Sequence, residues 1–240
     1  ILGTAPGSGK LPTAEIHCLS KDRDGYIWIG TEDGVAVCYN PGYVFNKDGY
    51  SFDFQQPFVE KADVPGPLLG GQSVTAICVD GANRKWIGTR RGVFLTNADG
   101  TEIIQNFNTS NSPLINDNIQ SIAINGETGE VFFGTEGGIQ SFKGTATTGR
   151  DNNNGVYAYP NPVKPGYYGP IAITGLVTDA NVKITDVAGR LVYETKAAGG
   201  QAMWNGKNFS NTDVNSGVYL VFITNDDGIE TMVTKILVVR

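Results

Sequence analysis

The first half of the chain carries apolar and polar residues in the short alternating segments that are typical of β-strands. In residues 16–21, successive side chains fall on two opposite faces, as they do along a strand. The pair Asp24-Gly25 predicts a hairpin turn, because glycine accepts a positive φ at little cost. Residues 26–29 are aromatic and β-branched and predict a second strand, and residues 34–39 predict a third. Since no segment shows the 3.6-residue period of a helix, the sequence predicts an all-β protein.

This strand pattern occurs three times in the first half of the chain. The copies lie near residues 16–39, 74–97 and 119–143, and their equivalent positions are roughly fifty residues apart. The positions that coincide in all copies are Trp28, Trp86 and Phe132, and Gly30, Gly88 and Gly134. A self-similar period of this length with β-type sequence is typical of propeller blades. We therefore expect residues 1–145 to form a partial β-propeller of about three blades.

The shared aromatic and glycine positions favour a structural role. A flat ring between neighbouring sheets buries a large apolar area, so we interpret Trp28, Trp86 and Phe132 as packing between blades and not as ligand contacts. We interpret the glycines as residues that the backbone conformation requires and not as part of a phosphate-binding loop. A nucleotide-binding loop needs a strand before it and a helix after it, and no such context follows these glycines. Since a propeller typically has about four to eight blades, we expect the chain to be the C-terminal part of a longer protein.

The second half of the chain has a different pattern. Residues 146–155 show no apolar periodicity, so we expect a linker there. Short strand-like segments with turn signals between them then continue along the chain. Residues 156–240 are therefore expected to form a seven-stranded, Ig-like β-sandwich. No segment approaches the ~18 apolar residues of a transmembrane span.

Composition and charge argue against several classes of function. The formal net charge is −6 and charged residues make up 18% of the chain, so a nucleic-acid-binding surface, which needs clustered basic groups, is not supported. The single histidine, His17, lies within a strand of the first copy, where the other copies carry Thr75 and Gln120. The acidic turn at residues 22–25 lacks the ligand spacing of a calcium loop. We therefore predict no catalytic residues, no metal ligands, no cofactor and no enzyme activity.

Two groups of aromatic residues are candidates for binding. Residues 39–58 are rich in aromatic side chains and form either an exposed platform for sugar or protein, or a fourth strand with a packed hairpin, which we favour. The loop at residues 165–170 carries Tyr167 and Tyr168, whose amphipathic rings suit contacts with carbohydrate or protein. The two rings equally suit a role in covering the edge of the sandwich, so both interpretations stay open.

Both halves of the chain resemble known families. The Trp-Ile-Gly-Thr core at residues 28–31 and 86–89, with Gly-Val after it, resembles the two-component regulator propeller repeat of Bacteroidetes proteins. The second half resembles the C-terminal domain of the type IX secretion system, in the segments Tyr159-Pro160-Asn161-Pro162-Val163, 173–176, 186–192, 204–206, 216–219 and 235–240. With residues 80–86 and 111–114, nearly the whole chain is similar to the C-terminal third of the PorZ family.

The resemblance to the PorZ family implies a non-enzymatic adaptor at the cell surface. Such a protein is exported to the outer face of the outer membrane, has no transmembrane segment, and joins an attachment complex with a sortase and other secretion-system proteins. The resemblance implies that it binds anionic lipopolysaccharide and presents this glycan to the sortase. Because aromatic rings stack on sugars, we take Tyr167 and Tyr168 as the ligand-binding candidates.

Two other functions remain as alternatives. The chain can belong to an exported cargo protein of the type IX system, whose C-terminal domain is a removable signal. It can also belong to the extracellular sensor propeller of a two-component regulator, since such regulators use similar repeats.

Overall fold

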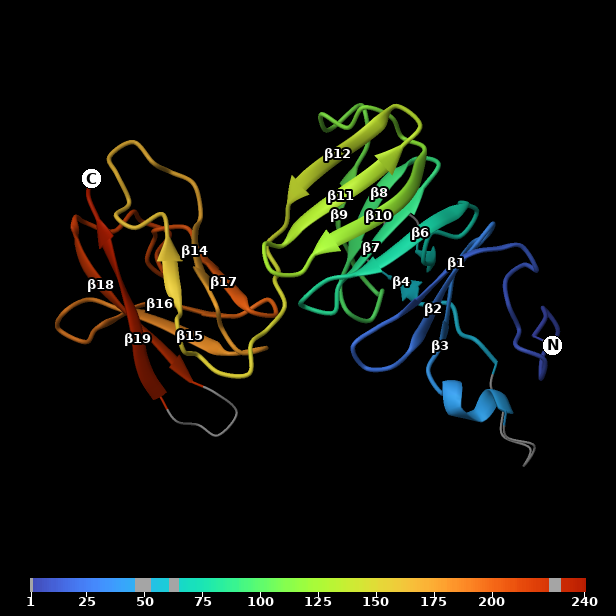
Figure 1. The fold of residues 1–240 in the computed structure, drawn as a ribbon, viewed down its shortest axis with the longest axis horizontal. Coiled ribbons are helices and arrows are strands. Elements are labelled where there is room, and N and C mark those ends of the chain that lie inside the picture. The colour runs from blue at the N-terminus through green and yellow to red at the C-terminus, as the bar shows by residue number, and fades with distance from the viewer. Residues whose placement is uncertain (1, 46–52, 61–64, 225–229) are drawn as a thin grey trace. The chain divides into compact units, whose positions relative to one another are not determined.

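The computed structural model describes residues 2–45, 53–60, 65–224 and 230–240, which form two compact units (Figure 1). The first unit contains Ile1–Ile124 with Glu130–Lys143, and the second contains Asn125–Gly129 with Gly144–Arg240. Apart from one short 3-10 helix, the described elements are strands, which confirms the all-β prediction. Within the described ranges, no helix has the length and apolar character needed to span a membrane.

The first blade is a three-stranded antiparallel sheet. Its strands are β1 (Ile16–Lys21), β2 (Ile27–Thr31) and β3 (Gly34–Cys38), paired in that order. The 3-10 helix η1 (Pro41–Phe45) and a hairpin of β4 (Phe58–Val59) and β5 (Gly66–Pro67) follow. In the aromatic segment 39–58, Gln55 pairs with Val37 of β3 and Phe54 is buried, so this part packs on the first blade. Residues 46–52 of the same segment lie outside the described residues.

The second and third blades repeat this antiparallel arrangement. The second blade contains β6 (Val74–Val79), β7 (Lys85–Thr89), β8 (Gly92–Thr96) and β9 (Ile103–Phe107), in that order. The third contains β10 (Ile119–Asn125), β11 (Glu130–Thr135) and β12 (Gly138–Lys143), in that order. The pairing register is the same in each blade: the shared glycine of the second strand lies opposite the residue that follows the turn glycine.

A threonine closes the tight turn between the second and third strands of every blade. The hydroxyls of Thr31, Thr89 and Thr135 donate to the carbonyl oxygens of Gly34, Gly92 and Gly138 at 2.9, 3.0 and 3.0 Å. The same hydroxyl oxygens accept a hydrogen bond from the backbone amide two residues further along. The three glycines have positive φ, which other residues adopt only at a cost. The threonine and the second glycine of the repeat therefore follow from the geometry of this turn.

Trp28 and Trp86 lie between consecutive blades. Each is 1% exposed. Trp28 belongs to an apolar cluster that includes Ile87 of the second blade, and Trp86 to a cluster that includes Phe133 of the third. Because an indole ring buries a large apolar area, these two residues are the central packing contacts of the two blade interfaces.

The shared glycines allow the next blade to approach closely. A Cβ atom on Gly30 would lie 2.7 Å from Cγ1 of Val74, and one on Gly88 would lie 2.6 Å from Cγ2 of Ile119. Val74 and Ile119 are fully buried residues at the start of the first strand of the following blade. Because close-packed interiors do not absorb such overlaps without displacement, inter-blade packing requires glycine at both positions. At Gly30, the Sγ atom of Cys18 in the same blade adds a second close contact.

Phe132 differs from the two tryptophans that share its register position. It is 37% exposed, and Ile139 on the same face is 79% exposed. Val35 and Val93, which take the place of Ile139 in the first two blades, are fully buried. No further blade covers this face of the third blade in the part of the chain that the structure describes. The expectation that Phe132 packs between blades is therefore corrected, and the buried aromatic residue is its neighbour Phe133.

The second unit is a sandwich of two antiparallel sheets. One contains β13 (Tyr157–Tyr159), β14 (Ile171–Thr174) and β17 (Gln201–Trp204), in that order. The other contains β16 (Leu191–Lys196), β15 (Asn181–Thr185), β18 (Gly217–Thr224) and β19 (Glu230–Val238), in that order. Fully buried side chains from both sheets, including Trp204, Ile173, Val182 and Ile236, form one core. The described strands match the seven-stranded sandwich that the sequence predicts.

Residues 146–155, where the sequence predicts a linker, contact the sandwich. Thr147 forms an isolated bridge with Gly199, and Arg150 forms one with Val177. The backbone amide of Arg150 also donates to the carbonyl oxygen of Leu176 at 2.9 Å. This segment therefore belongs to the second unit and lies beside the residues that follow β14.

Candidate functional site

The loop between β13 and β14 holds both tyrosines that the sequence analysis singled out. Tyr167 is half-buried, its ring packs against the sandwich core, and its hydroxyl donates to the carbonyl oxygen of Pro170 at 2.8 Å. Tyr168 is 78% exposed. The two rings thus have different environments: Tyr167 covers the core, and Tyr168 presents its ring to solvent.

Arg240 places a positive charge beside Tyr168. Its Cζ atom lies 5.9 Å from the centroid of the Tyr168 ring, within the range of a cation–π contact. The guanidinium donates to the carbonyl oxygens of Tyr167 at 3.1 Å and Gly206 at 3.3 Å, and lies 3.6 Å from Oδ1 of Asp213. These contacts hold the guanidinium in place beside the exposed ring.

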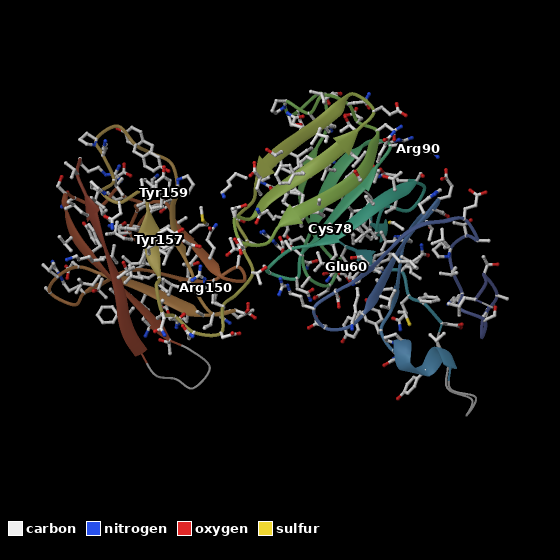
Figure 2. All side chains as sticks on the ribbon, in the orientation of Figure 1. Glu60, Cys78, Arg90, Arg150, Tyr157 and Tyr159 are labelled. Carbon is white, nitrogen blue, oxygen red and sulfur yellow. The ribbon has the colours of Figure 1, made fainter. Side chains whose placement is uncertain are left out.

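A cavity of about 390 Å³ adjoins Tyr167. It is lined by Tyr159, Pro160, Asn161, Pro162, Lys164 and Tyr167. The side-chain amide of Asn161 donates to the carbonyl oxygen of Lys235 at 2.8 Å, and its Oδ1 accepts from the backbone amide of Leu237 at 3.0 Å. Figure 2 shows Tyr159 and Tyr157 projecting from β13. The wall of the cavity is therefore tied to β19 by the two hydrogen bonds of Asn161.

His17 lies near a serine and a carboxylate, but the geometry is not that of a catalytic triad. Its Nε2 atom is 2.9 Å from Oε2 of Glu32 and 3.5 Å from Oγ of Ser73. A hydrogen bond from Ser73, which has the larger effect, and one from His17 lower the pKa of the Glu32 carboxyl group. In a triad, the serine hydroxyl contacts one nitrogen of the imidazole and gives its proton to it, while the acid contacts the other nitrogen and orients the ring. Here both approach the same nitrogen, so the cluster lacks the arrangement of a triad.

In the acidic turn at residues 22–25, the side chain of Asp22 stabilises the backbone of the turn. Oδ1 of Asp22 accepts hydrogen bonds from the backbone amides of Asp24 and Tyr26 at 3.0 and 2.9 Å. These bonds fix the hairpin turn, which is the ordinary use of an aspartate at this position. Among the described residues, no group of three or more His, Cys, Asp and Glu side chains is placed to hold a metal ion.

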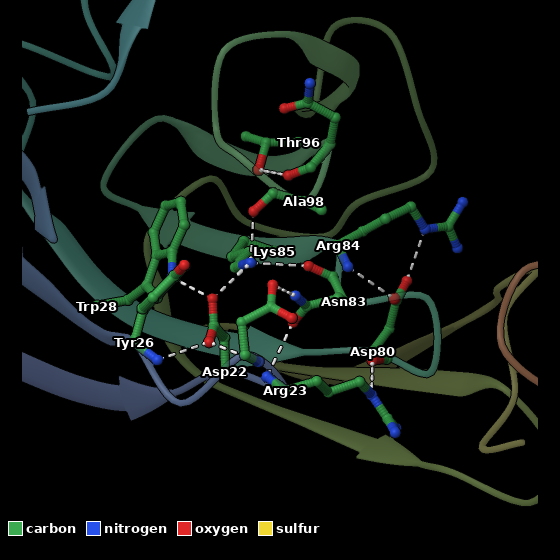
Figure 3. Close-up of polar contacts among 12 residues, drawn as sticks. Asp22, Arg23, Tyr26, Trp28, Asp80, Asn83, Arg84, Lys85, Thr96 and Ala98 are labelled. Carbon is green, nitrogen blue, oxygen red and sulfur yellow. Dashed lines mark hydrogen bonds and ion pairs between the residues drawn. The ribbon is translucent and has the colours of Figure 1, made fainter. Parts of the chain in front are cut away.

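A buried charged network joins the first two blades (Figure 3). Oδ2 of Asp22 accepts from Nε1 of Trp28 at 2.8 Å and lies 3.1 Å from Nζ of Lys85 on the second blade. Lys85 is fully buried and also donates to the carbonyl oxygens of Asn83 and Ala98. Its Nζ lies 4.4 Å from the centroid of the Trp28 ring. The ammonium and the carboxylate therefore neutralise each other's charge, and their ion pair joins the two blades.

The two charges of this network have shifted pKa values. Burial acts to raise the pKa of Asp22, but hydrogen bonds from Trp28 and Lys85 outweigh it, and the pKa lies below 3.8. Burial lowers the pKa of Lys85, and Asp22 opposes this shift. Because the folded pKa of Asp22 is below the unfolded value, its carboxylate contributes stability that is complete above about pH 4. This contribution is lost as the pH falls through the folded pKa.

We expect Asp22→Asn to make the free energy of unfolding depend less on pH in the acidic range. The variant is less stable than the wild type near neutral pH. The difference in the free energy of unfolding narrows as the pH falls below about 4, where the carboxylate of the unfolded chain takes up a proton, and it narrows further until the pH has passed the lower pKa of the folded state. Urea unfolding followed by tryptophan fluorescence, between about pH 2 and pH 6, measures this difference. A difference that stays constant across this range would show that ionisation of Asp22 does not stabilise the fold.

The sequence contains one signal for this network. Lys85 interrupts the apolar second strand at a position where the first copy has Ile27 and the third has Val131. A charge at a buried strand position requires a partner of opposite charge. The partner lies on another blade, so the sequence alone does not identify it.

Comparisons with known proteins match both parts of the chain. The secretion system C-terminal sorting domain matches residues 157–239, and the two component regulator propeller matches residues 10–33. The solved structure of PorZ, an essential bacterial surface component of the type-IX secretion system of Porphyromonas gingivalis, is 32% identical over 94% of this chain, with a TM-score of 0.65. The chain is of the PorZ type.

The PorZ-type chain spans 30% of the length of that solved structure. Its sorting domain coincides with the sandwich strands β13 to β19, and its propeller match covers the first two strands of the first blade. Extracellular domains of two putative hybrid two component systems from B. thetaiotaomicron are 15% and 16% identical, with TM-scores of 0.38 and 0.39. They cover 95% and 92% of the PorZ-type chain and 32% of their own chains. No curated protein sequence matches the chain.

Proposed function

We propose that this chain works as a non-enzymatic adaptor of type IX secretion at the cell surface. In this role it binds anionic lipopolysaccharide on the outer face of the outer membrane and presents the glycan to the sortase of an attachment complex. The observation that carries the proposal is the combination of propeller repeats and a sorting domain in one chain that is 32% identical to PorZ over 94% of its length. The relative is itself a surface component of this secretion system.

The surface of the sandwich supports a contact with an anionic glycan. Tyr168 presents its ring to solvent, and the guanidinium of Arg240 is held beside it. An exposed aromatic ring suits the apolar face of a sugar, and a fixed cation suits a phosphate or carboxylate on the same glycan. Tyr167 contributes indirectly, because its hydroxyl bond to Pro170 fixes the loop that carries Tyr168.

A measurement of lipopolysaccharide binding tests the proposal. Purified lipopolysaccharide from the bacterium that makes this protein is immobilised, and binding of the whole chain is measured by biolayer interferometry. We expect the wild type to bind and Tyr168→Ala to weaken binding about two- to tenfold, the effect of losing one aromatic contact. Phe209→Ala, which removes another exposed ring of the sandwich, serves as the control and keeps wild-type affinity. Absence of wild-type binding would contradict the adaptor role.

The sorting domain also supports a second candidate function. A domain of this family at residues 157–239 is what an exported cargo protein of the type IX system carries as a removable signal. Mass spectrometry of the native surface protein separates the two functions. An adaptor keeps residues 157–239, whereas a cargo protein loses the sequence that follows about residue 151.

A further inference from the structure

Strand β13 presents two tyrosine rings to solvent on one face. Tyr157 is 56% exposed and Tyr159 is 70% exposed, whereas Ala158 between them is buried in the sandwich core. Successive side chains of a strand point to opposite faces, so both rings stand on the outer side of the sheet. Two positions along a strand are roughly 7 Å apart, which places one ring after the other along a line.

The neighbouring strand leaves these rings accessible. Tyr157 pairs with Thr174 of β14, and Tyr159 pairs with Ala172. Both partners are small and half-buried, so their side chains do not cover the tyrosine rings. The faces of the two tyrosines are therefore open to a flat ligand, such as a sugar ring, lying along β13.

The cavity continues this exposed face beyond Tyr159. Tyr159 lines it together with Pro160, Pro162, Lys164 and Tyr167. Its volume of about 390 Å³ falls within the range of small-molecule sites, roughly 300–1,000 Å³. Most of its lining consists of aromatic and proline rings, and Lys164 adds an ammonium group. This combination suits an apolar sugar face that carries a negative substituent.

A second cation lies beyond Tyr157. Arg150 is bridged to Val177, three residues past Thr174, and its side chain is exposed. Figure 2 shows Tyr159, Tyr157 and Arg150 following one another on the sandwich. Neither Arg150 nor Lys164 forms an ion pair with another residue of the described ranges. Both charges are therefore available to an anionic ligand, one on each side of the tyrosines.

We propose that Lys164, Tyr159, Tyr157 and Arg150 form a binding strip for an anionic polysaccharide. Sugar rings stack on the two tyrosines, one sugar enters the cavity beside Lys164, and the cations bind phosphate or carboxylate groups along the chain. The inference rests on the proposed function, because it extends the surface that contacts the glycan of lipopolysaccharide from Tyr168 to these four residues. The lipid portion of lipopolysaccharide makes no contact in this arrangement.

The test uses the whole chain and four soluble probes. They are the lipid-free polysaccharide released from purified lipopolysaccharide by mild acid, the same polysaccharide after dephosphorylation, lipid A alone and inorganic phosphate. We expect the wild type to bind the polysaccharide, to bind its dephosphorylated form less tightly, and to bind neither lipid A nor inorganic phosphate. Binding to lipid A alone would overturn the inference, because it would place recognition on the lipid.

Matched variants locate the site. Tyr157→Ala/Tyr159→Ala is expected to lower affinity for the polysaccharide by about tenfold or more, whereas Tyr157→Phe/Tyr159→Phe keeps the rings and most of the affinity. Arg150→Gln/Lys164→Gln is expected to weaken binding and to reduce its dependence on salt. Phe209→Ala is the control and binds as the wild type does. Circular dichroism checks that each variant is folded. We expect all of them to fold, because the replaced side chains are exposed.

The outcomes separate this inference from the proposed function. If the wild type binds the polysaccharide and the double alanine variant binds it equally well, the strip is wrong and the adaptor role stands. If the wild type binds no form of lipopolysaccharide, both fail. If the alanine variant loses binding to a secretion-system protein but not to the polysaccharide, the strip recognises a protein and the inference is overturned.

Discussion

Replacing Lys85 by methionine is expected to destabilise the first unit by about 3–5 kcal/mol, the cost of leaving a buried charge without its partner. The carboxylate of Asp22 stays in the interface, since its side chain is 1% exposed, and it keeps only the hydrogen bonds from Trp28 and the turn amides. Methionine fills a similar volume, so the loss reports on charge and not on a cavity. Equilibrium urea unfolding of the whole chain, followed by tryptophan fluorescence, measures the change.

The double variant Asp22→Asn/Lys85→Met separates pairing from packing. Because both charges are gone, it is expected to lose less stability than Lys85→Met alone. Arg190→Met is the control: Arg190 pairs with Asp186 at 2.7 Å, but its side chain is 83% exposed, and such surface pairs contribute about 1 kcal/mol or less. Additive losses from the two single substitutions would contradict a coupled pair.

Truncating Trp86 to alanine is expected to cost about 3–5 kcal/mol, as large-to-small changes of buried aromatic residues do. Its ring lies 6.1 Å from that of Phe107 and 5.8 Å from those of Phe133 and Phe142, so the substitution removes the centre of an aromatic cluster. The same unfolding experiment measures the loss. A cost below about 1 kcal/mol would show that the second and third blades do not depend on this packing.

Phenylalanine substitutions distinguish the two interface tryptophans. The indole nitrogen of Trp86 has no hydrogen-bond partner within the described residues, whereas that of Trp28 donates to Asp22 at 2.8 Å. Trp28→Phe therefore removes a hydrogen bond to a charged group, worth about 1.5–3 kcal/mol, while Trp86→Phe removes an unpaired donor. We expect Trp28→Phe to be the more damaging change, and equal losses would contradict this difference.

Much of the propeller part was predictable from the sequence because its signals are local. The turn after the first strand, the β-branched strand that follows it and the Gly-Thr turn depend on neighbouring residues, and each repeat forms these elements. The exposure of Phe132 was not predictable in this way. Exposure of a residue at that position depends on whether another sheet covers it, and repetition of a motif does not supply the sheet.

The candidate site was predictable only in part, for a similar reason. Composition and loop position indicated Tyr167 and Tyr168, but the hydroxyl bond that distinguishes them depends on the path of the loop. The alternation of Tyr157 and Tyr159 around Ala158 was readable as a strand. Which side of that strand faces solvent depends on the second sheet of the sandwich, which is distant in the sequence.

The pairing of Asp22 with Lys85 also makes the blades chemically distinct, although their sequences are alike. Asp80, at the position of Asp22 in the second blade, binds Arg84 of its own turn at 2.8 Å, and the third blade has Val131 where the second has Lys85. If the first blade docked on the third during folding, its carboxylate would meet a valine. Tandem repeats are prone to such misassembly, and one unmatched charge disfavours the wrong neighbour. A single lysine thereby favours the second blade over the third as the neighbour of the first.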